Sequence, residues 1–328
     1  MNVYSKLKEI TFLRRIVKKV NVYKAFFQDA WVYNKYNMEE SYTRGEYDFR
    51  LLLLAHSIEK GMCMSELRPF GQNKCIEIMS ILQKYSIDKY SHSACKIAFS
   101  VLEEWCKVFE ENGWINDFEY RTIKEFVEEK KNMIKKVDAG CVEKTNTELW
   151  LDSSSTYELI VSSRRAVRNY NSQSLNDNDI EKCVKMAQMA PSACNRQMCK
   201  IVYVCNEEKC KSISKIIQGV SGFTLDTTKY FIISYDIRAF DGYGERNQGY
   251  FNAGLFAMNF VNALHSFNIQ TCFLQYATSY HENKKMHELL EIPEYEKIVT
   301  VIGAGYADEK VKLAKSSRKN IGEVYRKI

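Results

Sequence analysis

The chain has 328 residues, of which 45% are hydrophobic and 27% charged, a composition typical of a globular protein with one large or two medium domains. No apolar run reaches the roughly 20 residues that a membrane-spanning helix needs. Residues 1–20 scatter Lys and Arg through the segment where a secretory signal would have its apolar centre. We therefore expect a cytoplasmic protein.

The net charge of +6 comes from one end of the chain. Residues 1–24 contain seven Lys or Arg and one Glu, so the rest of the chain is neutral overall. This excludes a nucleic-acid-binding surface spread over a domain. The apolar residues of this segment recur at a helical period, which leaves two interpretations. One is a helix lying on an anionic membrane surface, and the other is a helix packed on its own protein with a solvated basic face.

The cysteines indicate a reducing compartment. There are eleven of them, an odd number, and many lie in apolar stretches. This pattern favours reduced thiols over a disulfide framework. Four of them superficially resemble a metal site: Cys194, Cys199, Cys205 and Cys210. Their spacing is not that of a zinc ribbon or finger, so we favour buried thiols and expect no metal.

The region from about residue 42 to residue 137 is predicted to be helical, because apolar residues recur three and four positions apart and glycine is sparse. The predicted helical segments are 45–62, 72–90, 92–111 and 117–136. Residues 144–155, rich in Thr, Ser, Asn and Asp, are the best candidate for a linker. The chain would then consist of a helical N-terminal region, 1–150, and a second domain, 151–328.

Beyond residue 157 the pattern alternates single strands with helices, as in a layered α+β or α/β domain. The predicted helices are 176–189, 245–267 and 281–290. The predicted strands are 200–205, 229–235, 269–275 and 298–303.

Three arginines, Arg164, Arg165 and Arg168, fall within five positions just beyond a predicted helix end. The guanidinium group offers a planar fork of donors that matches phosphate oxygens, and it stays charged at any working pH. The cluster therefore indicates a phosphate site, although a solvated basic patch would have the same composition.

Residues 190–197, with the sequence Ala-Pro-Ser-Ala-Cys-Asn-Arg-Gln, form a second candidate motif. Pro191 is expected to end the preceding helix, and the small residues after it leave the backbone accessible. Asn195 and Gln197 each carry a donor and an acceptor, which the imide edge of a flavin ring requires. A polar loop that caps a helix and leads into a strand is the alternative. Together with a phosphate clamp, this loop suits flavin mononucleotide (FMN).

In this order, the two motifs resemble the nitroreductase family of FMN-dependent oxidoreductases. That family has an Arg-Arg-Ser-Val-Arg-like start, then a helix, then an Ala-Pro-Ser-x-x-Asn-x-Gln loop leading into a strand. Residues 247–267 are similar to its central helix, 289–294 to its Leu-Leu-Gly-Ile-Pro-Glu turn, 301–306 to its Ile-Gly-Tyr strand and 317–324 to its C-terminal tail. The resemblance covers about residues 155–328, and the helical first half resembles that of longer bacterial members.

The resemblance implies an α+β fold with three layers, a mostly antiparallel sheet flanked by helices, preceded by an all-helical region. It also implies a homodimer with FMN at the interface, where residues 222–223 and the C-terminal tail would serve the partner. The implied cofactor-binding residues are Arg164, Arg165, Ala166, Arg168, Pro191, Ser192, Asn195, Gln197, Gln275 and Arg318. The arginines would bind the phosphate or the pyrimidine edge, Asn195 the ring amides, and the backbone of 275–278 would approach the flavin centre.

The resemblance further implies that the flavin, and no side chain, is the reactive centre. Hydride would pass from NADH or NADPH to flavin N5 and then to a small organic acceptor, in ping-pong order. Two alternatives stay open. One is a flavin enzyme with atypical chemistry, such as dehalogenation, dehydrogenation or flavin breakdown. The other is a non-enzymatic membrane-surface or assembly protein with a degenerate flavin domain.

The sequence departs from the family pattern at two places. Ala166 stands where the family usually has Ser, which removes one phosphate contact. Met198 and Cys199 replace the usual Pro-Trp or Pro-His near the substrate face, which suggests an unusual acceptor. In the helical region, His56 and Glu59 lie three apart on one predicted helix face, as an acid–base pair or a simple packing pair.

Overall fold

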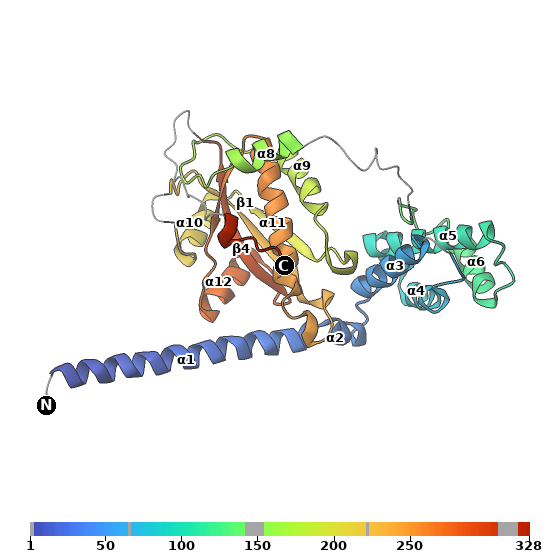
Figure 1. Cartoon of the computed structure of the whole chain (residues 1–328), viewed down its shortest axis with the longest axis horizontal. Coiled ribbons are helices and arrows are strands. Elements are labelled where there is room, and N and C mark those ends of the chain that lie inside the picture. Colours follow the sequence, from blue (N-terminus) through green and yellow to red (C-terminus); the bar gives the residue numbers. More distant parts are fainter. Residues whose placement is uncertain (1–2, 65–66, 142–153, 221–222, 308–320) are drawn as a thin grey trace.

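The computed structural model describes residues 3–64, 67–141, 154–220, 223–307 and 321–328. A long helix and a helical region come first, and a four-stranded sheet flanked by helices follows (Figure 1). The N-terminal elements are α1 (Val3–Tyr36), α2 (Met38–Thr43), α3 (Asp48–Met62), α4 (Gln72–Lys84), the 3₁₀ helix η1 (Ile87–Ser91), α5 (Ser93–Glu111) and α6 (Phe118–Lys130).

The second half begins with α8 and contains all four described strands of the sheet. Its longer helices are α8 (Ser154–Ser163), α9 (Asp177–Gln188), α10 (Glu207–Ile216), α11 (Gln248–Ser266) and α12 (Tyr280–Leu290). Its strands are β1 (Cys199–Val204), β2 (Lys229–Asp236), β3 (Gln270–Leu274) and β4 (Glu296–Gly305). Its 3₁₀ helices are η2 (Ala193–Asn195), η3 (Ile237–Ala239), η4 (Tyr243–Glu245) and η5 (Ile321–Glu323).

The sheet has the order β1-β2-β4-β3, and every neighbouring pair is antiparallel. Strand β2 is buried on both faces because its side chains alternate between two cores. Phe231 and Ile233 pack in one core with side chains of α9 and α11. Tyr230 and Ile232 pack in the other core, which also contains side chains of α10 and α12. The predicted α+β fold of three layers is thereby confirmed.

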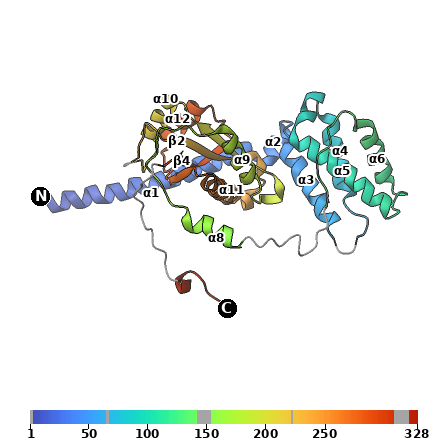
Figure 2. The same ribbon diagram turned by 90° about the horizontal axis from the view of Figure 1, so that it is seen from above.

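The helical region around α3–α6 has a core of its own, whose buried side chains all lie between residues 51 and 134. Trp105 and Phe109 of α5 are fully buried in it, with ring centroids 3.9 Å apart. The Trp105 Nε1–H donates to the carbonyl oxygen of Phe70 at 2.8 Å, which satisfies the one polar atom of that ring. Seen from above, this region stands apart from the sheet (Figure 2). The predicted linker lies almost entirely outside the described residues, so the domain boundary at 150 stays a prediction.

Helix α1 divides into two parts. Val32, Tyr33 and Tyr36, near its C-terminal end, pack against the core under α9 and α11. By contrast, every described side chain between residues 12 and 27 is exposed. The interpretation of the basic segment as a helix packed on its own protein is therefore wrong for residues 12–24. These residues are exposed because α1 extends away from the sheet domain along a straight axis, and no other described element lies beside that part of it (Figure 1).

Candidate functional site

The arginine cluster lies along the outer edge of β3. Arg164 directly follows α8, and Ala166 then forms a parallel bridge with Thr271 of that strand. The Val167 N–H donates to the carbonyl oxygen of Thr271 at 3.0 Å. Two backbone contacts thus fix the segment as an added edge of the sheet, and they place Arg164, Arg165 and Arg168 around one short extended stretch.

The side chains at this corner contact mostly backbone oxygens. Arg165 donates to the carbonyls of Ser162 and Arg164, and Arg168 donates to the carbonyl of Ala166 at 3.4 Å. Within the described residues, no carboxylate pairs with Arg164 or Arg165. A cluster of cations without such carboxylates is a suitable receptor for a phosphate dianion.

His265 of α11 belongs to the same corner. Its Nε2 lies 2.8 Å from the Ser163 hydroxyl, whereas its Nδ1 is buried and has no hydrogen-bond partner among the described residues. Burial holds the pKa of His265 below its usual value; the Gln270 side chain opposes this shift, and the charge of Arg164 adds a smaller lowering. The imidazole is therefore neutral at pH 7 and supports the end of α8 without adding charge.

The loop at residues 193–197 is strained. Cys194, Asn195 and Gln197 all have φ of 51°, in the left-handed region that non-glycine residues rarely adopt. The Ser192 hydroxyl accepts from the Gln197 N–H at 3.1 Å, which holds the two ends of the loop together. The side chains of Asn195 and Gln197 are exposed, and Ser192 is half-buried. Strained residues of this kind gather at binding sites, where the surrounding structure holds them.

Arg196 is what holds the loop, and the sequence analysis gave it no role. Its side chain is 1% exposed, and it forms a two-pronged ion pair with Glu245 at 2.6 and 2.9 Å. It also donates to the carbonyls of Ala193 and Ala239. Partial burial raises the pKa of Glu245, but the hydrogen bonds and charge of Arg196 outweigh this and lower it. The alternation of buried and exposed side chains could not predict that Arg196 is buried. The left-handed backbone of Asn195 and Gln197, on both sides of it, changes the direction in which successive side chains point.

The two candidate motifs lie at opposite corners of the sheet. Ala166 is level with Thr271 of β3 and Ala304 of β4. The loop leads into Cys199 of β1, which is level with Lys297 of β4 across β2. Four strand spacings of about 4.8 Å and seven residues of about 3.3 Å separate these corners, or about 30 Å on the diagonal. One chain therefore does not bring the two motifs together.

The other predicted residues fall in three places. Pro191 is exposed and lies in the loop corner, where it follows α9 as predicted. Gln275 is exposed and directly follows β3, the strand that carries the arginine segment. Arg318 and Gly222 lie outside the described residues, and so do residues 317–320, half of the tail.

A cavity of about 790 Å³ adjoins the loop and is lined by both the sheet domain and the helical region. Pro191, Ser192, Gln197 and Cys199 line it from the sheet domain. The helical region contributes the side chains of Asp48, Phe49, Leu52, Tyr85, Lys89 and His92. Cys199 therefore faces this cavity. Met198, by contrast, is fully buried in the core, so its departure from the family pattern does not line the cavity.

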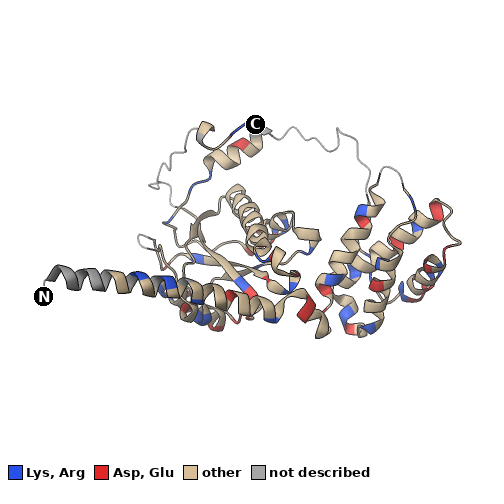
Figure 3. Cartoon of the chain, turned by 60° about the horizontal axis from the view of Figure 1, so that its bottom comes forward, with Lys and Arg blue, Asp and Glu red and all other residues tan. Residues whose placement is uncertain are grey.

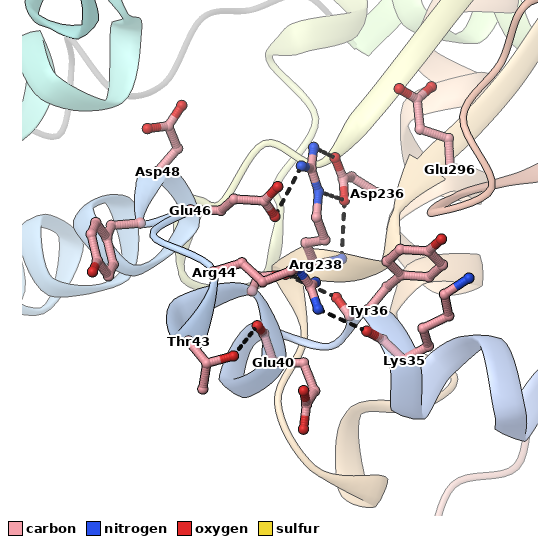
Figure 4. A network of polar contacts seen from close by, with 12 residues as sticks. Lys35, Tyr36, Glu40, Thr43, Arg44, Glu46, Asp48, Asp236, Arg238 and Glu296 are labelled. Carbon is pink, nitrogen blue, oxygen red and sulfur yellow. Dashed lines mark hydrogen bonds and ion pairs between the residues drawn. The ribbon is translucent and has the colours of Figure 1, made fainter. Parts of the chain in front are cut away.

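The wall of this cavity near α2 is fixed by charged side chains that join the two halves of the chain (Figure 4). Arg238 pairs with the buried Asp236 at 2.7 Å and with Glu46, in the turn before α3, at 3.2 Å. Partial burial lowers the pKa of Arg238, but hydrogen bonds to Asp236 and its charge raise it overall. Its guanidinium also stacks 3.7 Å above the Tyr295 ring. These contacts fix the helical region beside the loop.

Two other candidate groups have structural surroundings. His56 Nδ1 lies 3.5 Å from Glu59, whose carboxylate also accepts from the Gly140 N–H, so the pair holds a loop onto α3. Of the four cysteines weighed as a metal site, Cys210 is buried, Cys194 and Cys199 are partly buried, and Cys205 is exposed. In the described part of the chain, no three His, Cys, Asp or Glu side chains are grouped to hold a metal ion. Over the same part, no helix has the length and apolarity to cross a bilayer.

Part of this chain is similar to known proteins. Residues 161–221 and 218–306 match the model of the Nitroreductase family. A nitroreductase family protein from Streptococcus pneumoniae TIGR4 is similar at 22% identity, covering 52% of this chain and 100% of that chain, with a TM-score of 0.45. An FMN-dependent nitroreductase from Clostridium difficile R20291 is 21% identical, covering 51% of this chain and 96% of that chain, with a TM-score of 0.44.

A BluB-like flavoprotein from Clostridium difficile 630 is 19% identical, covering 52% of this chain and 98% of that chain, with a TM-score of 0.45. No curated protein matches the chain. The family match spans the arginine segment, the strained loop and the whole sheet. The family model thus matches one continuous stretch, residues 161–306, which is just under half of this chain.

Proposed function

We propose that this protein is an FMN-dependent oxidoreductase. The observation that carries the proposal is the pair of corners on a domain that the nitroreductase family model matches: a cluster of arginines at one and a strained, amide-bearing loop at the other. The arginine corner fits the cofactor's phosphate, since no described carboxylate neutralises Arg164 or Arg165. The loop corner fits the flavin imide edge, since Asn195 and Gln197 are exposed on a backbone that Arg196 holds rigid.

The bound FMN would take hydride from NADH or NADPH and pass it to a small organic acceptor in ping-pong order. The chain's own side chains bind and orient. Arg164, Arg165 and Arg168 would hold the phosphate, and Ala166 and Gln275 lie at the same edge of the sheet, where Ala166 bridges to β3 and Gln275 directly follows that strand. Arg318 remains a proposed further phosphate ligand.

The separation of the corners leads us to propose a homodimer in which each FMN lies between the arginines of one chain and the loop of the other. About 30 Å between the corners exceeds the length of one FMN, so a single chain cannot use both on one cofactor. Helix α11 offers a surface for the second copy. Phe251 and Met258 are 63% and 38% exposed, and Gly254 between them leaves open space for close approach.

Mixing two inactive variants tests this arrangement. One variant carries Arg164→Ala and Arg168→Ala, and the other carries Asn195→Ala and Gln197→Ala. If each site uses both chains, a mixed dimer has one intact site and one doubly damaged site, so activity returns to about a quarter of wild type. If each site lay within one chain, every site in the mixture would be damaged and no activity would return.

The visible spectrum of the purified protein tests the function itself. We expect a yellow protein with flavin absorption that NADH or NADPH bleaches in the absence of oxygen. Colourless protein that does not take up added FMN would overturn the cofactor proposal and favour the non-enzymatic alternative. Flavin that neither nucleotide bleaches would favour atypical flavin chemistry. The cavity favours that second candidate, because Tyr85, Lys89 and His92 of the helical region form its far wall.

A further inference from the structure

The free part of α1 is an amphipathic surface, which we call the basic arm and define as residues 12–27. Helix α1 has 34 residues and is therefore about 51 Å long. Only its C-terminal end is fixed: the Tyr33 hydroxyl donates to the Gly242 carbonyl at 2.8 Å, and Lys35 pairs with Glu294 at 2.9 Å. Lys297 of β4 pairs with Asp29 at 2.5 Å, and beyond this contact the arm projects into solvent (Figure 1).

The large apolar side chains of the basic arm share one side of the helix, because they recur three and four positions apart. Each of them is between 42% and 75% exposed: Phe12, Leu13, Ile16, Val17, Val20, Tyr23, Phe26 and Phe27. A continuous apolar strip of this size is unusual on a protein surface and marks a place where another surface binds.

The charge of the arm identifies the kind of surface. Residues 10–28 contain five Lys or Arg and no Asp or Glu. Arg15, Lys19 and Lys24 are exposed: at 100° per residue Arg15 lies just outside the apolar strip, and Lys19 and Lys24 lie just inside its two edges. Figure 3 shows the basic residues along this helix. Packing this helix against the same helix of a second copy would bring like charges together. An anionic lipid surface instead offers negative headgroups to the cations and hydrocarbon to the apolar strip.

We propose that the basic arm lies flat on an anionic bilayer surface, with its apolar strip among the acyl chains and its Lys and Arg among the headgroups. The described residues include no helix that could cross the bilayer, so the arm binds in the plane of the surface. The contacts of Tyr33, Lys35 and Asp29 continue the arm rigidly into the sheet domain. The FMN domain is thereby held beside the membrane, independently of what it reduces.

Co-sedimentation of the full chain with vesicles tests this proposal. Vesicles of phosphatidylcholine with about 30% phosphatidylglycerol should bind the protein, pure phosphatidylcholine vesicles should not, and added salt should release it. The triple variant Ile16→Gln, Val20→Gln, Phe27→Gln and the triple variant Arg15→Gln, Lys19→Gln, Lys24→Gln should each bind at least about tenfold more weakly. The matched control Lys211→Gln, Lys284→Gln, Lys285→Gln removes the same charge from α10 and α12 and should bind normally.

Three results would overturn the proposal: no binding of the wild type, equal binding to neutral vesicles, or unchanged binding of both arm variants. If the apolar variant instead changed the oligomeric mass in solution and not vesicle binding, the arm would be a contact between copies. Circular dichroism of each variant checks that it is folded. Flavin absorption is measured on the same samples. A failure of the FMN proposal can therefore be told apart from a failure of the membrane proposal.

A second, independent observation concerns two thiols of the helical region. The Sγ atoms of Cys63, just after α3, and Cys141 are 3.2 Å apart, and both residues are exposed. The Gly140 N–H donates to Glu59 of α3 at 3.2 Å, so the backbone before Cys141 is held against that helix. Six of the other nine cysteines are buried. The pair is therefore placed for reaction with each other.

We infer that Cys63 and Cys141 form a reversible disulfide by exchange with a small disulfide such as glutathione disulfide. Both thiols lose a proton and two electrons pass to the small disulfide, which leaves as two thiol molecules. The hydrogen bond that the Cys63 thiol donates to Cys141 raises the pKa of Cys63, so the exchange should become faster towards alkaline pH.

Peptide mapping of the folded full chain after treatment with glutathione disulfide at about pH 8.5 tests this. We expect a Cys63–Cys141 cross-linked peptide that dithiothreitol removes, and a glutathione adduct on Cys205, the exposed cysteine in the sheet domain. In the Cys63→Ser variant, Cys141 should instead carry glutathione. Glutathione adducts on both Cys63 and Cys141 of the wild type, or no reaction at either, would overturn the inference.

Discussion

The two corners of the sheet are built in opposite ways. The loop corner contains three residues at φ of 51°, and a buried arginine with its carboxylate partner holds them in place. The arginine corner has ordinary extended backbone, and its charges contact mostly carbonyl oxygens of their own segment. The loop corner is thus complete without a ligand, whereas at the arginine corner no carboxylate of the described residues pairs with Arg164 or Arg165. Rigid amides can select a planar ring, and flexible cations can gather around a phosphate.

The sharpest way to break this comparison is to remove charge from the arginine corner. In the variant Arg164→Ala, Arg168→Ala, two charge-assisted hydrogen bonds to phosphate are lost at roughly 1.5–3 kcal/mol each, so FMN affinity should fall at least about 100-fold. Fluorescence titration of apoprotein with FMN measures it. Arg121→Ala, an exposed arginine on α6, is the matched control and should bind FMN normally. A loss below about threefold in the double variant would contradict the phosphate role.

The loop corner should instead respond in stability. In Glu245→Gln, the guanidinium of Arg196 stays buried but loses its charged partner, so unfolding should become easier by about 2 kcal/mol at pH 7, allowing for the partial exposure of Glu245. Because the folded-state pKa of Glu245 is lowered, its contribution is complete above the unfolded-state value of 4.5 and is lost as pH falls through the folded-state pKa. Urea unfolding of both proteins at pH 7 and at pH 3 measures this.

At pH 3 the two unfolding curves should lie closer together than at pH 7. Glu288→Ala is the matched control, because its ion pair with Lys284 is exposed and should contribute almost nothing. An equal difference between wild type and Glu245→Gln at both pH values would mean that shape, and not charge, holds the loop.

The strain in the loop predicts a smaller effect. Cys194 has φ of 51° and ψ of 32°, a region that glycine occupies freely and that β-branched residues avoid. Cys194→Val should therefore destabilise the fold by roughly 1–2 kcal/mol, and Cys194→Gly should be neutral or slightly stabilising. Thermal unfolding of the two variants side by side measures it. If both variants lost the same stability, the thiol's contacts and not the backbone conformation would be responsible.

Periodicity was enough to predict the helices and strands that bury one clear face, such as α5 and α11, and motif order indicated the family. Helix α10 was not predicted, because Lys and Glu occupy half of it and only Cys210 and Ile213 are buried. The burial of Arg196 could not be predicted, since it depends on Glu245, which is distant in sequence. The distance between the two corners could not be predicted either, because it follows from strand order and register and not from the spacing of the motifs in the sequence. The exposure of the basic arm depends on the direction in which α1 leaves the domain.

The smallest expected effect returns to the arginine corner. Ala166 is half-buried against the core that contains Val167, and its backbone is fixed by the bridge to Thr271, so Ala166→Ser adds a hydroxyl within the arginine segment without a change in fold. One further hydrogen bond of about 0.5–1.5 kcal/mol should tighten FMN binding about 2- to 10-fold, and Ala25→Ser on the basic arm should change nothing. Weaker binding in Ala166→Ser would mean that the phosphate lies elsewhere. Unchanged binding would mean that the arginines alone already satisfy its oxygens, and the corner would then be more complete than the comparison with the loop suggests.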